Sequence, residues 1–226
     1  MPAKLTPAAD STRWSRQRLL DVLRLYLVTD QASLRGRTLC DVVLAAVQGG
    51  VTCVQLREKQ LDSRDFYAQA VALMELLRPL HVPLIINDRI DIALACGAQG
   101  VHLGQSDLPV QAARALLPPE VFIGWSVETP GQVAQSASLP VDYLGVSPVF
   151  ATPTKTDTAT PWGLDGLQCV RHATDLPLVA IGGIHLHNAA EVLCAGADSL
   201  AVVSAICSAD DPRAASQQLR DVIDAH

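Results

Sequence analysis

The stretch that decides the fold is residues 84–104, LIINDRIDIALACGAQGVHLG. It opens with the apolar run Leu84–Asn87, continues with the helical pattern Ile90–Cys96, and closes with a second apolar run, Gly100–Leu103. Two short buried strands joined by a helix are typical of a parallel pair, because the helix carries the chain back to the same edge of the sheet. The unit predicts an α/β fold in which helices cover a parallel sheet.

The same alternation extends over almost the whole chain. We expect eight strands: Leu25–Thr29, Cys53–Lys59, Leu84–Asn87, Gly100–Leu103, Phe122–Ser126, Tyr143–Pro148, Leu178–Ile181 and Ser199–Val203. We expect eight helices: Thr38–Val47, Ser63–Leu80, Ile90–Cys96, Val110–Leu117, Gln132–Ser136, Leu164–His172, Asn188–Cys194 and Pro212–Ala225. Eight strand–helix units close a (β/α)8 TIM barrel, and a doubly wound open sheet is the alternative. The barrel domain is expected over residues 24–226, after an N-terminal extension, residues 1–23, whose helix packs on one end of it.

Composition excludes several classes of function. The 226 residues carry a net charge of −6 and no basic stripe, which argues against a nucleic-acid partner. No apolar run approaches the ~20 residues of a membrane span, and no signal peptide is evident. The six cysteines form no CxxC pair, as expected for reduced thiols in the cytoplasm. Helix surfaces rich in Ala and Leu allow a homodimer.

The second expected strand carries the most informative polar residues. Gln55, Arg57 and Lys59 occupy alternate positions and should therefore point together into the barrel. A guanidinium and an ammonium side by side form an anion cage that fits a diphosphate. An internal salt-bridge network with Asp30 or Glu58 is the structural alternative.

Two aspartates follow the next two strands. Asp88 ends the third strand, and Asp107 comes shortly after the fourth. Neighbouring parallel strands lie roughly 4.8 Å apart, so both carboxylates can reach one ion. Mg²⁺ typically takes one or two carboxylates together with phosphate oxygens and water, and the pair therefore predicts a metal-assisted diphosphate site.

The remaining strand ends indicate phosphate contacts. The runs 181–184 and 202–205, which include Gly183, Val203 and Ser204, follow the last two strands, where barrels bind phosphate through backbone N–H groups and a short helix. Ser126 ends the fifth strand and could hydrogen-bond a phosphate oxygen, with no base in sequence reach. Residues 151–158 are dense in hydroxyls and are interpreted as a lid rather than a flexible linker.

Three histidines are expected to have structural rather than catalytic or metal-binding roles. His185 and His187 form an HxH pair without further evident metal ligands and are read as loop or helix-start residues. His102 lies within the fourth strand and is expected to be a hydrogen-bonded core residue rather than a catalyst.

Six motifs in this order resemble the thiamine-phosphate synthase family over residues 24–213. They are Gln55-Leu56-Arg57-Glu58-Lys59, Ile86-Asn87-Asp88-Arg89, Val101 through Asp107, Gly145 through Pro148 with Thr152-Pro153-Thr154-Lys155, Ile181-Gly182-Gly183-Ile184, and Val203-Ser204-Ala205-Ile206. The resemblance implies an enzyme that joins an aminopyrimidine diphosphate to a thiazole phosphate and releases diphosphate, through a pyrimidinylmethyl cation.

The resemblance also implies a role for each matching residue. Mg²⁺ would be bound by Asp88 and Asp107. The substrates would be bound by Gln55, Arg57, Glu58, Lys59, Asn87, Ser126, Thr152, Thr154, Lys155, Gly183, Val203 and Ser204. Of these, Arg57, Lys59, Ser126 and Lys155 would act in catalysis.

Some residues depart from the family pattern. Besides the N-terminal extension, they are Trp125 in place of a small or aliphatic residue, Glu128 in place of a common histidine, and Trp162. Two alternatives therefore stay open. One is a thiazole tautomerase or sugar-phosphate isomerase, which needs only the last phosphate site, and the other is a non-catalytic barrel that binds thiamine precursors.

Overall fold

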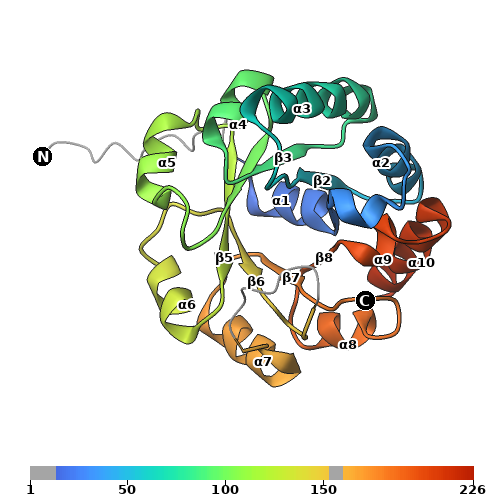
Figure 1. The fold of residues 1–226 in the computed structure, drawn as a ribbon. Coiled ribbons are helices and arrows are strands. Elements are labelled where there is room, and N and C mark those ends of the chain that lie inside the picture. Colours follow the sequence, from blue (N-terminus) through green and yellow to red (C-terminus); the bar gives the residue numbers. More distant parts are fainter. Residues whose placement is uncertain (1–13, 153–159) are drawn as a thin grey trace, which may run out of the picture.

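The computed structural model describes residues 14–152 and 160–226 and shows a closed parallel barrel, viewed along its axis in Figure 1. The order β1 to β8 follows the sequence, and β8 pairs with β1. The strands are β1 Leu25–Val28, β2 Cys53–Leu56, β3 Leu84–Asn87, β4 Gly100–Leu103, β5 Phe122–Val127, β6 Tyr143–Val146, β7 Leu178–Ile181 and β8 Ser199–Val202. The predicted TIM barrel is confirmed, and the open sheet is excluded.

Helices follow each strand and form the outer ring. In the described residues they are α1 Arg16–Leu23, η1 Gln31–Leu34, α2 Leu39–Gln48, α3 Ser63–Leu77, η2 Arg78–Leu80, α4 Ile90–Cys96, α5 Val110–Leu116, α6 Pro130–Ser136, α7 Gly163–Ala173, α8 Ala189–Cys194, α9 Ser204–Cys207 and α10 Pro212–Asp224. Thr38 caps α2 as expected, since its side chain accepts the Asp41 N–H. Helix α3 begins at Ser63 as predicted, with Asp62 as its N-cap, and it ends at Leu77 rather than at Leu80. The short elements η1 and α9 were not among the predicted helices.

Several strands are shorter than the sequence suggested. β2 ends at Leu56 rather than Lys59, and β6 ends at Val146 rather than Pro148. The reason at β2 is local. The Arg57 N–H donates to the Thr29 side-chain hydroxyl at 3.1 Å, so the backbone ladder with β1 stops there.

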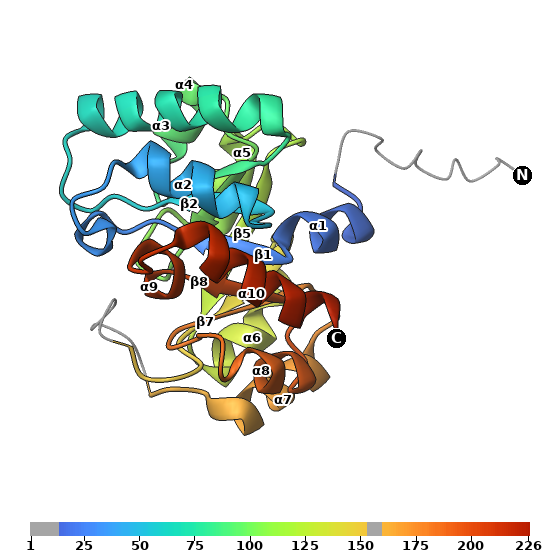
Figure 2. The same ribbon diagram turned by 90° about the vertical axis from the view of Figure 1, so that its right-hand side faces the viewer.

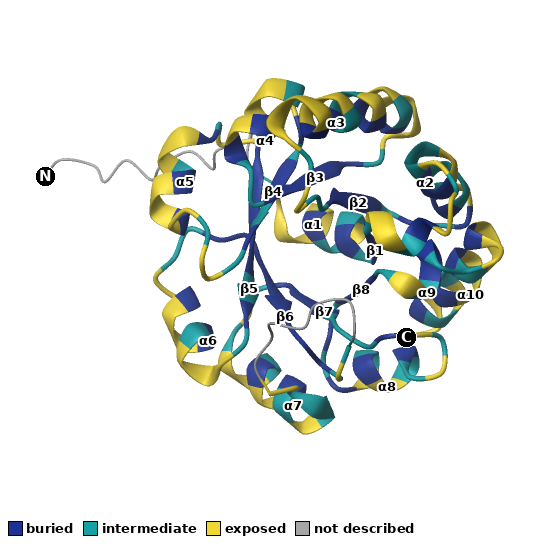
Figure 3. Cartoon of the chain, viewed as in Figure 1, coloured by how far each residue is buried: buried dark blue, intermediate teal, exposed yellow. Residues whose placement is uncertain are grey.

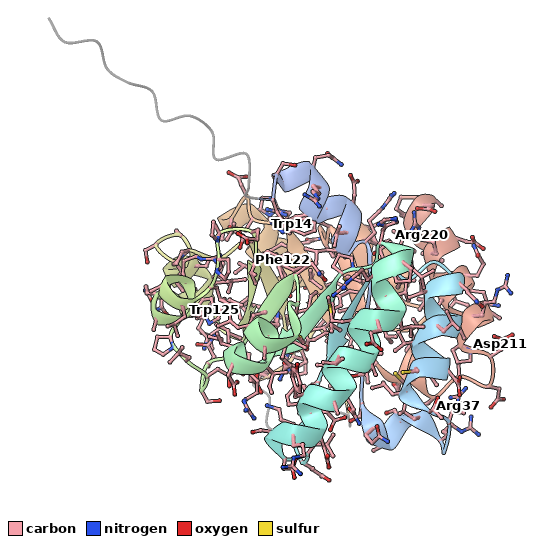
Figure 4. The ribbon with its side chains drawn as sticks, turned by 90° about the horizontal axis from the view of Figure 1, so that it is seen from above. Trp14, Arg37, Phe122, Trp125, Asp211 and Arg220 are labelled. Carbon is pink, nitrogen blue, oxygen red and sulfur yellow. The ribbon has the colours of Figure 1, made fainter. Side chains whose placement is uncertain are left out.

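The core has two layers, one between strands and helices and one inside the barrel. The strands that separate the two layers are coloured mostly as buried in Figure 3. Alternation along each strand divides the residues. In β2, Val54 and Leu56 belong to the outer layer, and Cys53 belongs to the inner layer. Trp125 in β5 also belongs to the outer layer, on the helix side of the sheet. It is labelled in Figure 4.

Helix α1 covers one end of the barrel. Leu19 and Leu23 belong to the inner core layer, and Trp14 packs edge-on against Phe122 with ring centroids 5.0 Å apart (Figure 4). The Arg18 guanidinium lies 3.9 Å from the Trp14 ring centroid on the other side. Figure 2 shows α1 and α9 at opposite ends of the barrel. None of the helices in the described part of the chain is long and apolar enough to cross a bilayer.

Candidate active site

A cavity of about 900 Å³ opens at the carboxyl ends of the strands, the end at which α9 lies. Loops and ends of all eight strands line it. The predicted site residues on its wall are Gln55, Arg57, Lys59, Asn87, Asp88, Asp107, Ser126, Thr152, Gly183, Val203 and Ser204. Glu58 is not on that wall. Thr154 and Lys155 lie outside the described residues.

Arg57 brings a half-buried positive charge to the cavity. Among residues 14–152 and 160–226, no carboxylate lies within the 4.0 Å of an ion pair with its guanidinium. Neighbouring Glu58 has a raised pKa because of burial first and the charge of Asp30 second, and Arg57 partly offsets the rise. The predicted alternative, a salt bridge from Arg57 to Asp30 or Glu58, is therefore not what the described residues form.

Lys59 does have a partner, and it is Asp88. The Lys59 ammonium donates to Asp88 Oδ2 at 2.5 Å, although the lysine side chain stays 52% exposed. Asp88 directly follows β3 and adopts the left-handed conformation, with φ of 62°. Aspartate tolerates this region better than most residues, and such conformations gather at functional sites. The turn keeps the Asp88 carboxylate at the cavity wall.

Asp107 stands against the same carboxylate. Its Oδ2 accepts the Gly104 N–H at 2.6 Å, which holds the side chain toward β4. Burial raises the pKa of Asp107, and a hydrogen bond with Asp88 raises it further. Two neighbouring carboxylates repel each other when both are ionised, so a cation bound between them would relieve the repulsion.

The donor set fits Mg²⁺. Asp88 and Asp107 offer hard oxygen ligands on the wall of a cavity that is large enough for phosphate groups and water. Proteins usually bind Mg²⁺ through one or two carboxylates together with substrate phosphates and water. Among the described residues, no cluster of three or more His, Cys, Asp or Glu side chains could hold a metal alone. A metal at this position would thus depend on oxygens from a ligand.

The β7–β8 side of the cavity is built differently. Gly182 and Gly183 follow β7 with φ of 105° and 64°. A Cβ on Gly183 would lie 2.8 Å from the Ala151 carbonyl oxygen, so this glycine is needed because the loop after β6 passes close by. The Asn188 side chain donates to the Gly183 carbonyl at 2.9 Å and fixes the turn. The unpredicted short helix α9 starts at Ser204, directly after β8.

The sequence interpretation missed a set of hydrogen bonds under the cavity. Ser126 Oγ lies 2.8 Å from His102 Nε2, although no base was expected near this serine. His102 Nδ1 lies 2.8 Å from the Tyr143 hydroxyl, which is 3.0 Å from the Tyr26 hydroxyl. Gln55 Nε2 donates to Tyr26 at 2.6 Å. The signal available in the sequence was the presence of polar groups at inward-facing strand positions.

The departures from the family pattern lie in different places. Trp125 is buried in the outer layer and does not line the cavity. Trp162 packs against that layer, and its indole N–H donates to the Val127 carbonyl at 3.3 Å. Glu128 does line the cavity. Of the two histidines after β7, His185 lines it, and its ring centroid is 5.8 Å from that of His187.

Comparisons with known proteins agree on one family. The family model described as thiamine monophosphate synthase matches residues 25–206. A thiamine-phosphate synthase of Albidiferax ferrireducens is 74% identical, over 91% of this chain and 94% of the relative, and one of Vibrio campbellii is 52% identical, over 88% and 98%. Among solved structures, thiamine phosphate pyrophosphorylase from Pyrococcus furiosus superposes with a TM-score of 0.84 at 36% identity, covering 92% of this chain and 98% of that one.

Proposed function

Because the chain belongs to the thiamine monophosphate synthase family, and is a transferase that condenses a pyrimidine and a thiazole moiety, we propose how its residues divide the reaction. The observation that carries the proposal is the division of one cavity into a charged half after β2–β4 and a glycine-containing half after β7–β8. Each substrate brings a phosphate group of its own. Two unlike anion sites on one wall therefore suit two phosphorylated reactants.

The charged half binds the aminopyrimidine diphosphate. Arg57, without a carboxylate within ion-pair distance among the described residues, supplies a planar pair of donors for phosphate oxygens. Lys59 exchanges its bond to Asp88 for one to the diphosphate. Gln55, Asn87 and Ser126 line the wall beside them and hold the pyrimidine end.

Asp88 and Asp107 would hold Mg²⁺ together with oxygens of the substrate's diphosphate. A bound Mg²⁺ would supply positive charge that stabilises diphosphate as a leaving group. The protein's own part is to place the guanidinium and the ammonium where negative charge develops as the bond to the pyrimidinylmethyl carbon breaks. The reaction is then dissociative, and the thiazole nitrogen attacks the pyrimidinylmethyl cation.

The thiazole phosphate, with or without a 2-carboxylate, occupies the β7–β8 half. Gly183, Val203 and Ser204 line this side, and Thr152 approaches from the loop after β6. The family motif alone assigns Thr154 to the thiazole phosphate and Lys155 to the diphosphate of the other substrate. Backbone N–H groups at the turn after β7 and at the start of α9 suit a phosphate monoester. Holding both reactants in one cavity supplies the alignment that a two-substrate condensation needs.

Residues 1–23 are proposed to form an extension in front of a single catalytic barrel, residues 24–226. A cytoplasmic location is supported by six free cysteines, which suit a reducing compartment. A homodimer is supported by exposed large side chains on α3–α5 and their loops, among them Leu94 and Leu116. The acidic net charge of −6 supports small molecules rather than nucleic acid as partners.

Turnover with defined substrates tests the proposal. The purified protein with Mg²⁺, aminopyrimidine diphosphate and thiazole phosphate should form thiamine phosphate and diphosphate in equal amounts. EDTA should abolish the reaction, and excess Mg²⁺ should restore it. Unchanged rates in chelator would remove the metal from the mechanism. Binding of both substrates by calorimetry without product would instead favour the non-catalytic alternative.

A further inference from the structure

A continuous line of hydrogen bonds crosses the inside of the barrel at the base of the cavity. It runs from Gln55 through the hydroxyls of Tyr26 and Tyr143 to the His102 ring and ends at Ser126, with successive distances of 2.6, 3.0, 2.8 and 2.8 Å. All five residues line the cavity, and the two ends of the line lie on different strands, Gln55 on β2 and Ser126 on β5. The line therefore joins two distant parts of the cavity wall.

Glycine makes the crossing sterically feasible. His102, Gly124 and Tyr143 are paired neighbours on β4, β5 and β6. A Cβ on Gly124 would lie 2.0 Å from Tyr143 Cζ and 2.3 Å from its hydroxyl oxygen. The missing side chain leaves the space through which Tyr143 reaches His102. Gly145 does the same for the imidazole, since a Cβ there would lie 2.9 Å from His102 Cε1.

The hydrogen bonds have one direction. Gln55 Nε2 can only donate, so the Tyr26 oxygen accepts. Burial raises the pKa of both Tyr26 and Tyr143, so each phenol keeps its single proton. A buried hydroxyl proton without an acceptor is costly, and the Tyr26 proton therefore points to Tyr143, whose own proton points to His102 Nδ1.

The direction fixes what the cavity wall presents at each end. With Nδ1 accepting, neutral His102 carries its proton on Nε2 and donates it to Ser126 Oγ. The Ser126 proton then points away from the imidazole and is available to a ligand. At the other end, one N–H of the Gln55 amide donates to Tyr26, which orients the amide and leaves its carbonyl oxygen able to accept from a ligand, with the second N–H still a donor.

We propose that Tyr26 and Tyr143 are positioning residues that hold Gln55 as an acceptor and Ser126 as a donor for the pyrimidine ring. An aminopyrimidine has the complementary pattern, an exocyclic N–H donor and ring nitrogen acceptors. The inference rests on the proposed function for the identity of this ligand. The direction of the hydrogen bonds does not depend on it.

The His102 tautomer tests the direction without any substrate. In protein with 15N-labelled histidine, the neutral His102 ring should be protonated on Nε2, and a His102→Gln variant identifies its signals. Tyr26→Phe removes the hydroxyl that relays the direction, so both tautomers should appear. Tyr67→Phe, which removes an exposed hydroxyl on α3, should leave the tautomer unchanged. Protonation on Nδ1 in the unaltered protein would overturn the inference.

Kinetics tests the effect on the ligand. Tyr26→Phe should raise the KM for the aminopyrimidine diphosphate about tenfold, the effect of one lost hydrogen bond, and leave the KM for thiazole phosphate unchanged. Tyr143→Phe should do the same and provides a second variant should either fold poorly. A shifted tautomer with an unchanged KM in both variants would overturn the positioning role. Absence of turnover in the unaltered protein would contradict the proposed function instead. The His102 tautomer would still show in which direction the hydrogen bonds between Gln55 and Ser126 run.

Discussion

The two halves of the cavity wall hold their ligands by different physical means. After β2–β4, the wall carries four charged side chains, those of Arg57, Lys59, Asp88 and Asp107, of which Lys59 and Asp88 form an ion pair at 2.5 Å. After β7 and β8, residues 181–184 and 202–205 contain no charged side chain at all. The first half must exchange ionic partners when its ligand binds, whereas the second presents a turn whose shape is already set by Gly183 and Asn188.

This contrast separates the contribution of each half to turnover from its contribution to binding. Charged side chains can follow a diphosphate as it departs, and their effect is greatest where charge develops during the reaction. A fixed backbone turn binds a phosphate that does not change during the reaction, so it contributes mainly to binding. Substitutions in the first half should therefore affect turnover, and substitutions in the second half should affect affinity.

The largest effect is expected at Arg57. Arg57→Ala should lower kcat/KM for the aminopyrimidine diphosphate about 10³-fold, since the guanidinium has no carboxylate within ion-pair distance among the described residues and is there for the ligand. Steady-state kinetics measures the loss of kcat/KM, and thermal melting measures the stability of the ligand-free variant. The melting temperature should hardly change. Arg35→Ala, which removes an exposed pair with Asp210, is the matched control with normal kinetics. A large loss of ligand-free stability would show that Arg57 is structural.

A smaller effect is expected at Asp107. Asp107→Asn should lower turnover about 10²-fold in Mg²⁺, since it removes a carboxylate from the proposed metal site. Without metal the same variant should melt no lower than the unaltered protein at neutral pH. The pKa of Asp107 is raised in the folded state, so its ionised form costs stability above that pKa.

The stability of Asp107→Asn relative to the unaltered protein should depend on pH. As the pH falls from neutral through the raised pKa of Asp107 toward the ordinary value for aspartate, the folded protein takes up a proton and the cost disappears. Any stability gain of Asp107→Asn should therefore shrink over that range. Asp210→Asn, at an exposed aspartate, is the control with normal turnover. A fall in melting temperature at neutral pH without metal would contradict the prediction.

The smallest effect on turnover is expected in the other half. Gly183→Ala should raise the KM for thiazole phosphate about tenfold and leave kcat nearly unchanged, because the new Cβ would meet the Ala151 carbonyl and displace the turn. Gly97→Ala also places alanine at a positive φ, 71°, but no atom lies within 4 Å of its Cβ. It should cost a similar roughly 1 kcal/mol of backbone strain without any kinetic change. A fall in kcat for Gly183→Ala alone would break the division between the two halves.

Much of this arrangement was predictable from periodicity. The strands Leu84–Asn87, Gly100–Leu103 and Leu178–Ile181 have the predicted bounds, because short apolar runs covered by helices leave little choice. The inward direction of Gln55 also follows from alternation and is confirmed by its bond to Tyr26. Alternation was carried too far at Lys59, which lies beyond the end of its strand.

The partners of polar groups could not be predicted in the same way. Lys59 was expected to face an anion or to pair with Asp30 or Glu58, yet it binds Asp88, which is 29 residues away. The contact depends on the left-handed conformation of Asp88, and composition does not reveal such a backbone angle. His102 reaches Tyr143 only because Gly124 lies between them on the middle strand. Such relations arise from register across strands rather than from order along the chain.

Helix α1 affects how substrates can enter the cavity and how products can leave it. Trp14, Leu19 and Leu23 pack over the opposite end of the barrel, so among residues 14–152 and 160–226 the cavity opens at the carboxyl ends of the strands. Both substrates and both products must then pass through the same opening, and the product that is released last delays binding of the next substrate.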